Sequence, residues 1–224
     1  LYDYGTRMPL AIMWPRQMPG GRVIDDFVNL TDLAPTFLEV AGVPVPEVMS
    51  GRSLLAMLKS KEEGRIENDR YAVYSARERH AWARLEGAGY PARMIRTKDY
   101  LYIRNYEPDR WPAGIRAIRT NEGRYGDIDQ SPTKQVMLKN KDEYPRLFDL
   151  AFGKRPAEEL YDCNEDPYQM NNLAGDPAYQ NTLKKLSDHL TAHLKATGDP
   201  REVSGEAPWD DYKYHGRTWG PVEK

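Results

Sequence analysis

A dense group of side chains suited to ligand chemistry is the run Arg77-Glu78-Arg79-His80-Ala81-Trp82-Ala83-Arg84. Guanidinium groups suit a sulfate or carboxylate, a carboxylate binds hydroxyls or an amine, and an indole ring stacks on a pyranose face. The run follows a predicted strand, so it lies where a strand end opens into a loop. The predicted substrate-binding residues are Glu78, Arg79, His80 and Trp82. The alternative is a solvated loop whose charges pair with one another.

The single cysteine and one pair of histidines are weaker candidates for a functional site. Cys163 is the single cysteine, so it forms no internal disulfide and no thiolate metal cluster, and a half-buried inert thiol is the favoured interpretation. His189 and His193 have the i, i+4 spacing of a chelating pair, but no third ligand lies nearby in sequence. A surface helix face is therefore favoured for them. We predict no catalytic residue and no metal ligand in the chain.

Composition excludes two classes of partner. The 224 residues are 40% hydrophobic and 29% charged with a net charge of -2, which gives no electrostatic case for nucleic acid. No stretch approaches the roughly 18 apolar residues of a membrane helix, so no membrane span is expected. The chain has 15 tyrosines and 5 tryptophans but only 4 phenylalanines, which favours aromatic side chains that are partly exposed to solvent. Such side chains suit a sugar-binding site, but packing at a domain interface is the simpler explanation.

Residues 1–65 have the pattern of the end of an α/β unit. The unbroken apolar run 9–14 predicts a strand buried on both faces of a parallel sheet. A helix is predicted to begin at Thr31 or Asp32 and to stop at Gly42, with Leu33, Phe37, Leu38 and Ala41 packed on that sheet. The chain starts without an initiator Met, and we interpret it as a fragment. The charged segment 59–69 sets the predicted boundary between domains 1–65 and 66–224.

Residues 66–224 have an α+β pattern. Strands are expected at 71–75, 92–96, 100–104 and 159–162, and a helix capped by Asp176 at 177–197. The helix carries a stripe that includes Leu183, Leu186 and Leu190, so we expect a small antiparallel sheet with one long helix packed across it. Residues 105–144 show little regular pattern, and the tail from residue 201 is expected to be an extended arm that packs on another surface.

The order of short motifs is similar to that of the formylglycine-dependent sulfatases. The motifs are Leu1-Tyr2-Asp3-x-Gly5-Thr6-Arg7-x-Pro9-Leu10, Asp32-Leu33-Ala34-Pro35-Thr36, Gly51-Arg52-Ser53-Leu54, Glu159-Leu160-Tyr161-Asp162 and Asn172-Leu173-Ala174. They frame nearly the whole chain and resemble the part of a sulfatase that follows its last metal-binding loop. Within the family, Tyr90-Pro91-Ala92-Arg93 and Asp127-Ile128-Asp129-x-Ser131-Pro132-Thr133 look most like bacterial relatives of heparan N-sulfatase, the sulfamidase.

The resemblance implies the end of an alkaline-phosphatase-like parallel-sheet domain followed by the sulfatase C-terminal subdomain. It also implies a sulfated glycan substrate, sulfate ester or sulfamate hydrolysis, and a periplasmic or secreted location. Calcium and formylglycine are implied for the intact enzyme only, because their residues precede this chain in the family. Cys163 is followed by Asn-Glu-Asp and does not match the C-x-P-S-R motif.

The resemblance thus predicts an inactive fragment that retains the pocket wall and whose partner is a missing N-terminal catalytic portion. Arg7 is a candidate support for the sulfate pocket behind the direct contacts, with bonding to loop carbonyls or to an acidic residue as the alternative. Two rival functions stay open. One is a phosphate or phosphonate hydrolase of the same superfamily, and the other is a non-catalytic carbohydrate-binding or packing domain.

Overall fold

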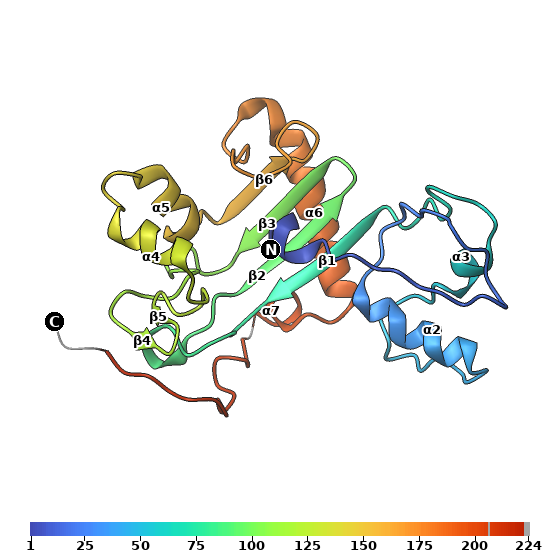
Figure 1. The fold of residues 1–224 in the computed structure, drawn as a ribbon, viewed down its shortest axis with the longest axis horizontal. Helices are drawn as coiled ribbons and strands as arrows, with labels where there is room; N and C mark the ends of the chain where they lie inside the picture. Colours follow the sequence, from blue (N-terminus) through green and yellow to red (C-terminus); the bar gives the residue numbers. More distant parts are fainter. Residues whose placement is uncertain (206, 222–224) are drawn as a thin grey trace.

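A four-stranded antiparallel sheet forms the centre of the molecule (Figure 1). The computed structural model describes residues 1–205 and 207–221. The strands are β1 (Ala72–Arg77), β2 (Ala92–Thr97), β3 (Tyr100–Asn105) and β6 (Glu158–Asp162), in the order β1-β2-β3-β6. Every neighbouring pair is antiparallel. The strand positions and their antiparallel pairing, predicted from alternating side chains, are therefore confirmed.

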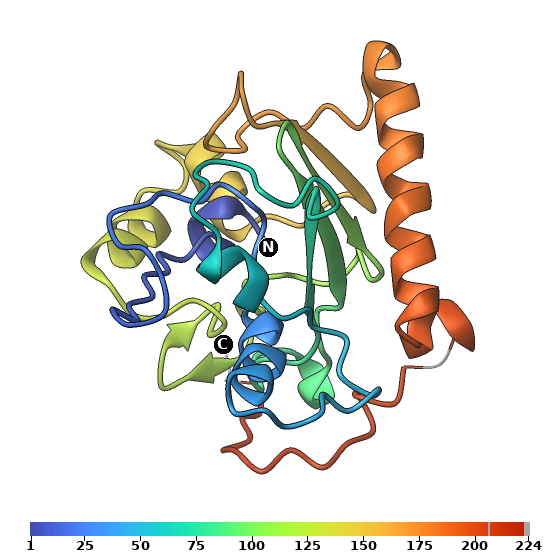
Figure 2. The same ribbon diagram turned by 90° about the vertical axis from the view of Figure 1, so that its right-hand side faces the viewer.

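One long helix covers one face of this sheet (Figure 2). The short helix η3 (Pro177–Tyr179) leads into α6 (Gln180–Ala196), and the Asp176 carboxylate accepts a hydrogen bond from the Ala178 amide at 2.8 Å. Its buried stripe packs on Ile95, Tyr102 and Leu160 of the sheet. The stripe is Leu183, Leu186, Leu190 and Leu194. The predicted helix and its packing are confirmed, and His189 and His193 are more exposed than the leucines.

The first 66 residues form short helices and loops rather than part of a parallel sheet. The helices are α1 (Asp3–Thr6), η1 (Leu30–Asp32), α2 (Leu33–Val40) and α3 (Leu55–Lys59). The strand predicted over 9–14 is not formed, and Met13 is 85% exposed. A strand needs a neighbour to satisfy its backbone, and no strand among the described residues lies beside this run. Only an isolated parallel bridge, Ile24 to Gly64, is seen in this part of the chain.

The helix expected from residue 31 also differs in its start and its buried face. The Asn29 side chain caps it, and Asp32 completes a capping box. Phe37, expected to pack on a sheet, is exposed, whereas Pro35 and Thr36 are buried. The end is as predicted, because Gly42 has a φ of +69° in the left-handed region that terminates helices.

Arg70 joins the two parts of the chain. Its guanidinium lies 2.9 Å from the Asp32 carboxylate and donates to the carbonyl oxygens of Arg52 and Ser53. Its side chain is buried, so these contacts fix the sheet's first strand against the segment before it. The boundary between residues 65 and 66 stays a prediction.

The segment between β3 and β6 holds structure that the sequence pattern did not predict. It contains the two-stranded hairpin β4 (Arg119–Thr120) and β5 (Gly123–Arg124), followed by α4 (Pro132–Lys139) and α5 (Pro145–Phe152). Ala113, Tyr125 and Phe152 are buried in a small core there. The single turn η2 (Leu85–Gly87) follows β1, and α7 (Pro200–Val203) follows α6.

Candidate functional site

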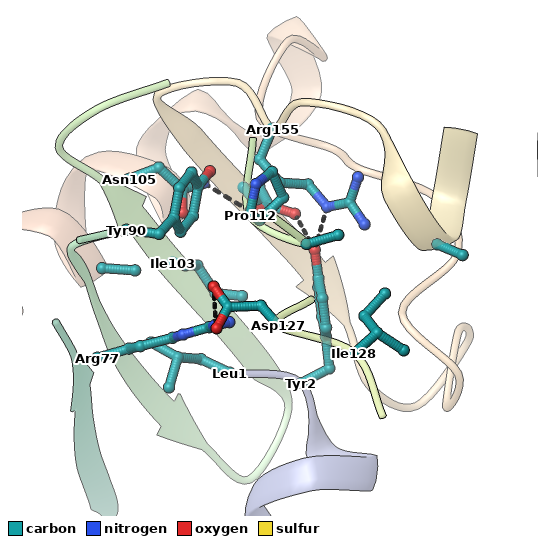
Figure 3. A pocket seen from close by; sticks show the side chains of 14 residues that line it. Leu1, Tyr2, Arg77, Tyr90, Ile103, Asn105, Pro112, Asp127, Ile128 and Arg155 are labelled. Carbon is teal, nitrogen blue, oxygen red and sulfur yellow. Dashed lines mark hydrogen bonds and ion pairs between the residues drawn. The ribbon is translucent and has the colours of Figure 1, made fainter. Parts of the chain in front are cut away.

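A polar pocket of about 190 Å³ opens on the sheet face opposite α6. It lies between the start of the chain, the strand ends and the loops around residues 112 and 127 (Figure 3). Its polar lining is Tyr2, Arg77, Tyr90, Asn105, Asp127, Arg155 and Glu159. We refer to it as the Asp127 pocket.

Strand register brings the sheet-borne members of this lining together. Arg77 pairs with Ala92, and Ala92 pairs with Asn105, so the three stand in one row on one face. Alternation along β6 sends Glu159 to the same face, whereas Glu158 hydrogen-bonds Tyr102 on the α6 side. Strand register and the alternation of side chains along each strand therefore determine which sheet residues line the pocket.

Asp127 is the residue of the pocket that three basic side chains contact. Its carboxylate is 1% exposed and lies 3.1 Å from an Arg77 nitrogen and 3.1 Å from His80 Nδ1. Arg84 also donates to it. Two guanidiniums and an imidazole thus converge on one buried carboxylate, so this side of the pocket has more donors than acceptors.

The loop that carries Asp127 is held by a buried lysine. Lys134 Nζ donates to the carbonyl oxygens of Glu122, Tyr125 and Ile128 at 2.6, 3.1 and 2.6 Å. Burial lowers the pKa of Lys134 below its usual value. A Cβ at Gly126 would lie 2.3 Å from the Thr120 hydroxyl, so only glycine fits beside Asp127. The Asp127 amide completes the arrangement by donating to the Ala113 carbonyl.

Glu159 forms a second buried cluster on the opposite wall. Its carboxylate accepts hydrogen bonds from the hydroxyls of Tyr2 and Tyr161 at 2.8 and 2.6 Å and from the Asn105 amide at 2.7 Å. Arg155 donates to the Tyr2 hydroxyl at 2.8 Å. Burial, reinforced by the negative charge of Glu159, raises the pKa of both tyrosines. These phenols stay protonated and keep the carboxylate fixed.

The structure places the four predicted substrate-binding residues on one loop and gives each of them a partner within the chain. Glu78 lies 2.7 Å from both Arg93 and Arg201. Arg79 donates to the carbonyl oxygens of Asp210 and Tyr212 and stacks on Tyr214.

Trp82 and His80 complete the loop. Trp82 Nε1 donates to the Trp219 carbonyl at 3.0 Å. The described part of the tail, residues 201–205 and 207–221, therefore packs on this loop, whereas residues 206 and 222–224 lie outside the described residues. His80 differs from the other three, since its side chain is 67% exposed and, within residues 1–205 and 207–221, bonds Asp127 alone. A substrate-binding role for all four residues stays a prediction.

Arg7 lies apart from the Asp127 pocket. It is exposed and lines a neighbouring cavity of about 770 Å³ together with Tyr4, Lys154 and Tyr168. The two cavities share Tyr2, Arg155 and Glu159 in their walls, so Arg7 is near the same region of the molecule. Its supporting role also stays a prediction.

Cys163 and the described acidic groups do not fit the calcium ion and the formylglycine that the sequence resemblance implies for the intact enzyme. Burial raises the pKa of the Cys163 thiol to about 11, so it is protonated at neutral pH and unreactive. Within residues 1–205 and 207–221, no group of three or more His, Cys, Asp or Glu side chains is arranged to hold a metal ion. In the same part of the chain, no helix is long and apolar enough to cross a membrane.

The fold and the pocket define a mixed α/β domain with a small pocket, lined in part by charged side chains, on the sheet face opposite α6. Residues 1–113 match the family described as N-sulphoglucosamine sulphohydrolase, C-terminal. The chain belongs to this sulfatase family. The predicted family resemblance is confirmed.

Individual relatives agree with this assignment. The chain is 32% identical over 197 residues to an ulvan-active sulfatase of Formosa agariphila, which covers 88% of this chain and 34% of that protein. It is 27% identical over 216 residues to human N-sulphoglucosamine sulphohydrolase, covering 89% of this chain and 39% of that protein. It therefore spans about a third of the length of these relatives.

A solved structure supports the fold alone. The candidate sulfatase yidJ of Bacteroides fragilis superimposes with a TM-score of 0.50 at 18% identity, covering 84% of this chain and 29% of that one. The predicted class, mixed α/β with an antiparallel sheet and one long helix, is confirmed.

Proposed function

We propose that this chain is the sugar-binding C-terminal part of a sulfatase that hydrolyses sulfate esters or sulfamates of a sulfated glycan. The observation that carries the proposal is the Asp127 pocket, where Arg77, Arg84 and His80 surround one buried carboxylate in a chain of the sulfatase family. Arginine-rich, partly apolar hollows suit anionic sugars. Relatives described as ulvan-active sulfatase and N-sulphoglucosamine sulphohydrolase support a glycan as substrate.

The nucleophile and the metal are proposed to come from elsewhere in the protein. The relatives are about three times as long as the region they share with this chain, so there is room for an N-terminal catalytic portion. Formylglycine and calcium would belong to that portion. In this proposal the domain boundary lies between residues 65 and 66, and the enzyme works in the periplasm or outside the cell.

Within the sugar-contacting loop, the proposed roles differ. His80 touches the sugar, because its ring is exposed to solvent and is oriented by Asp127, which lines the pocket. Glu78, Arg79 and Trp82 contribute by fixing the loop through Arg93, Arg201 and the tail, as well as through any sugar contact of their own. Arg7 supports the anion site from the neighbouring cavity.

The first test compares the complete protein with the 224-residue chain. Sulfate release is measured from sulfated oligosaccharides and from an aryl sulfate, with and without a calcium chelator. We expect turnover by the complete protein and none above background by the isolated chain, since the uncatalysed barrier is very high. Phosphodiester hydrolysis without sulfate release would favour the phosphate hydrolase. Glycan binding without any turnover would favour the non-catalytic module.

The second test changes the loop in the complete protein. His80→Ala is expected to raise KM for the oligosaccharide about tenfold while the aryl sulfate, which lacks the sugar, changes by less than about twofold. His215→Ala, in the exposed tail, is the matched control. An equal loss on both substrates would mean that His80 acts on folding or on the reaction centre, and the proposed sugar contact would be abandoned.

A further inference from the structure

One buried hydroxyl in the Asp127 pocket lacks a hydrogen-bond partner. Tyr90 is 3% exposed, and its Oη is the buried side-chain polar atom left unpaired among the described residues. Burial raises the pKa of Tyr90 to about 12, so the group is a donor at neutral pH. Leaving such a hydroxyl unpaired costs about 1–3 kcal/mol, and native proteins rarely do so without a reason. Tyr90 is one of the residues that line the pocket (Figure 3).

Arg77 brings unused donors to the same pocket. Its guanidinium has one partner among the described residues, the Asp127 carboxylate at 3.1 Å, and its side chain is 31% exposed. Arg84, the other guanidinium on Asp127, is instead saturated by main-chain carbonyls. These are the carbonyls of Ala88, Trp111 and Pro112. Of the two arginines on Asp127, Arg77 is thus the one free to bind a ligand.

The unused groups determine the chemistry of the ligand. Tyr90 and Arg77 are donors. The two carboxylates that line the pocket, Asp127 and Glu159, are each already occupied by three partners. An acceptor-rich anion satisfies such a site better than a neutral hydroxyl. The volume of about 190 Å³ lies below the roughly 300–1,000 Å³ of pockets for drug-sized ligands, so it suits a charged substituent and part of one ring.

We propose that Arg77 and Tyr90 form a specificity subsite for an oxyanion substituent of the glycan, a carboxylate or a sulfate other than the one removed. The inference rests on the proposed function, because the subsite binds a second anionic group on the same glycan whose sulfate is hydrolysed. It adds Arg77 and Tyr90 to the four predicted substrate-binding residues, and it predicts which glycans the enzyme prefers. The complete enzyme should prefer glycans whose ring carries this second anion.

Tyr90→Phe is the sharpest variant, since no residue that the structure describes bonds this hydroxyl. It should leave the melting temperature unchanged or slightly higher and raise KM for the anion-bearing oligosaccharide about tenfold, with kcat retained. Tyr102→Phe is the matched control, because its hydroxyl bonds Glu158 and Ser187 on the α6 side. That variant should melt earlier without a change in KM. A tenfold effect from Tyr102→Phe, or none from Tyr90→Phe, overturns the proposal.

Arg77→Gln separates the two sources of the anion. Its KM penalty is measured with an oligosaccharide containing a uronic acid, with the same oligosaccharide after carboxyl reduction, and with one lacking the second sulfate. Loss of the penalty after carboxyl reduction identifies a carboxylate, and loss after removal of the second sulfate identifies a sulfate. A penalty of the same size on all substrates, including the aryl sulfate, overturns the subsite.

Direct binding distinguishes failure of the subsite from failure of the proposed function. Calorimetric titration of the complete protein uses a methyl glucuronoside, a methyl glucoside sulfate and the neutral methyl glucoside. We expect only an anionic sugar to bind, and Tyr90→Phe and Arg77→Gln each to weaken that binding. If this holds in a protein that releases no sulfate, the proposed function is wrong and the subsite stands. If neither anionic sugar binds, or binding ignores both variants, the subsite is wrong.

Discussion

Asp127 is the side chain on which the charge balance of the pocket depends. It is the shared partner of Arg77, Arg84 and His80, and the Arg84 guanidinium is nearly as buried as the carboxylate. Removing the charge of a buried partner leaves the remaining ion uncompensated, which costs more than the pair itself contributes. The Asp127 carboxylate therefore stabilises the fold as well as orienting groups that face the pocket.

Asp127→Asn is accordingly expected to lower the free energy of unfolding by at least about 2 kcal/mol. Urea denaturation followed by circular dichroism measures this loss. Asp69→Asn is the control, since Asp69 is exposed and pairs with Arg52 at the surface, and its denaturation midpoint should not move. Similar small shifts in both variants would mean that the Asp127 charges are solvated, contrary to the structure.

His193 carries a second electrostatic signature, away from the pocket. Its ring stacks on Tyr74 with centroids 3.5 Å apart, and burial lowers its pKa below the usual value of 6.5. The folded state then binds fewer protons than the unfolded state. The stability from neutral His193 is complete above pH 6.5 and is lost as the pH falls below that value, until it levels off beneath the folded-state pKa.

His193→Phe keeps a stacking ring and removes the titration. The difference in unfolding free energy between this variant and the unchanged protein should grow in favour of phenylalanine from about pH 7 to about pH 5. Measurements at about pH 8, where the imidazole is neutral in both states, provide the reference. A difference that stays constant across this range would show that burial does not perturb His193.

At the scale of elements, the segment 122–128 is held by the side chain of a single residue, Lys134. Lys134 lies in the first turns of α4 and holds three carbonyls of that loop, while Ser131 caps the same helix. Lys134→Met retains most of the buried side-chain volume but removes all three hydrogen bonds. The loop should lose order before the sheet does.

The expected readout for Lys134→Met is faster hydrogen exchange at the amides of Asp127 and Ile128, with the amides of β2 and β3 unchanged. Lys139→Met, on the exposed side of α4, serves as the control and should exchange as the unchanged protein does. Faster exchange throughout the sheet would mean that Lys134 supports the whole fold rather than the pocket loop.

The elements that sequence patterns predicted are those with local causes. Strands β1, β2, β3 and β6 show alternation, and α6 combines an Asp-Pro start with a leucine stripe. The helix α4 was missed although Ser131-Pro132 is a cap followed by a first-turn proline, a signal that would have found it. The strand over 9–14 was wrong because its apolar run has no sheet neighbour among the described residues.

The site was predicted less well than the sheet. The run that begins at Arg77 was recognised from its composition, although Arg77 itself was not among the four predicted binding residues. Tyr90, Asn105, Asp127 and Glu159 were not identified as site residues. Their meeting depends on strand register and on a loop contact, Asp127 to Arg84, that spans 43 residues of sequence. Composition likewise could not show that Glu78 and Arg79 would be held by the distant residues Arg201 and Tyr212. Such pairings are tertiary properties.

At the scale of the whole molecule, the first part of the chain has many large apolar side chains exposed on its surface. Met8, Met13, Phe37 and Val48 are among its exposed side chains. Clusters of large apolar groups on a protein surface usually mark a contact. The run 9–14 also has the unbroken hydrophobicity of a buried strand while its backbone lacks a sheet partner among the described residues. In the proposed function, the catalytic portion of the same protein covers these side chains.

Met13→Lys tests whether the catalytic portion covers these exposed side chains. In the isolated 224-residue chain, where Met13 is 85% exposed, a lysine at this position should leave the melting temperature unchanged and improve solubility. In the complete protein the same change would bury an unpaired charge, so we expect a loss of at least about 2 kcal/mol in the free energy of unfolding and of much of the sulfatase activity. Lys61→Met, a reverse change at an exposed site, should be neutral in both proteins. If Met13→Lys were equally harmless in both, the 9–14 segment would remain solvent-exposed in the complete protein, and the contact between the two portions would have to lie elsewhere.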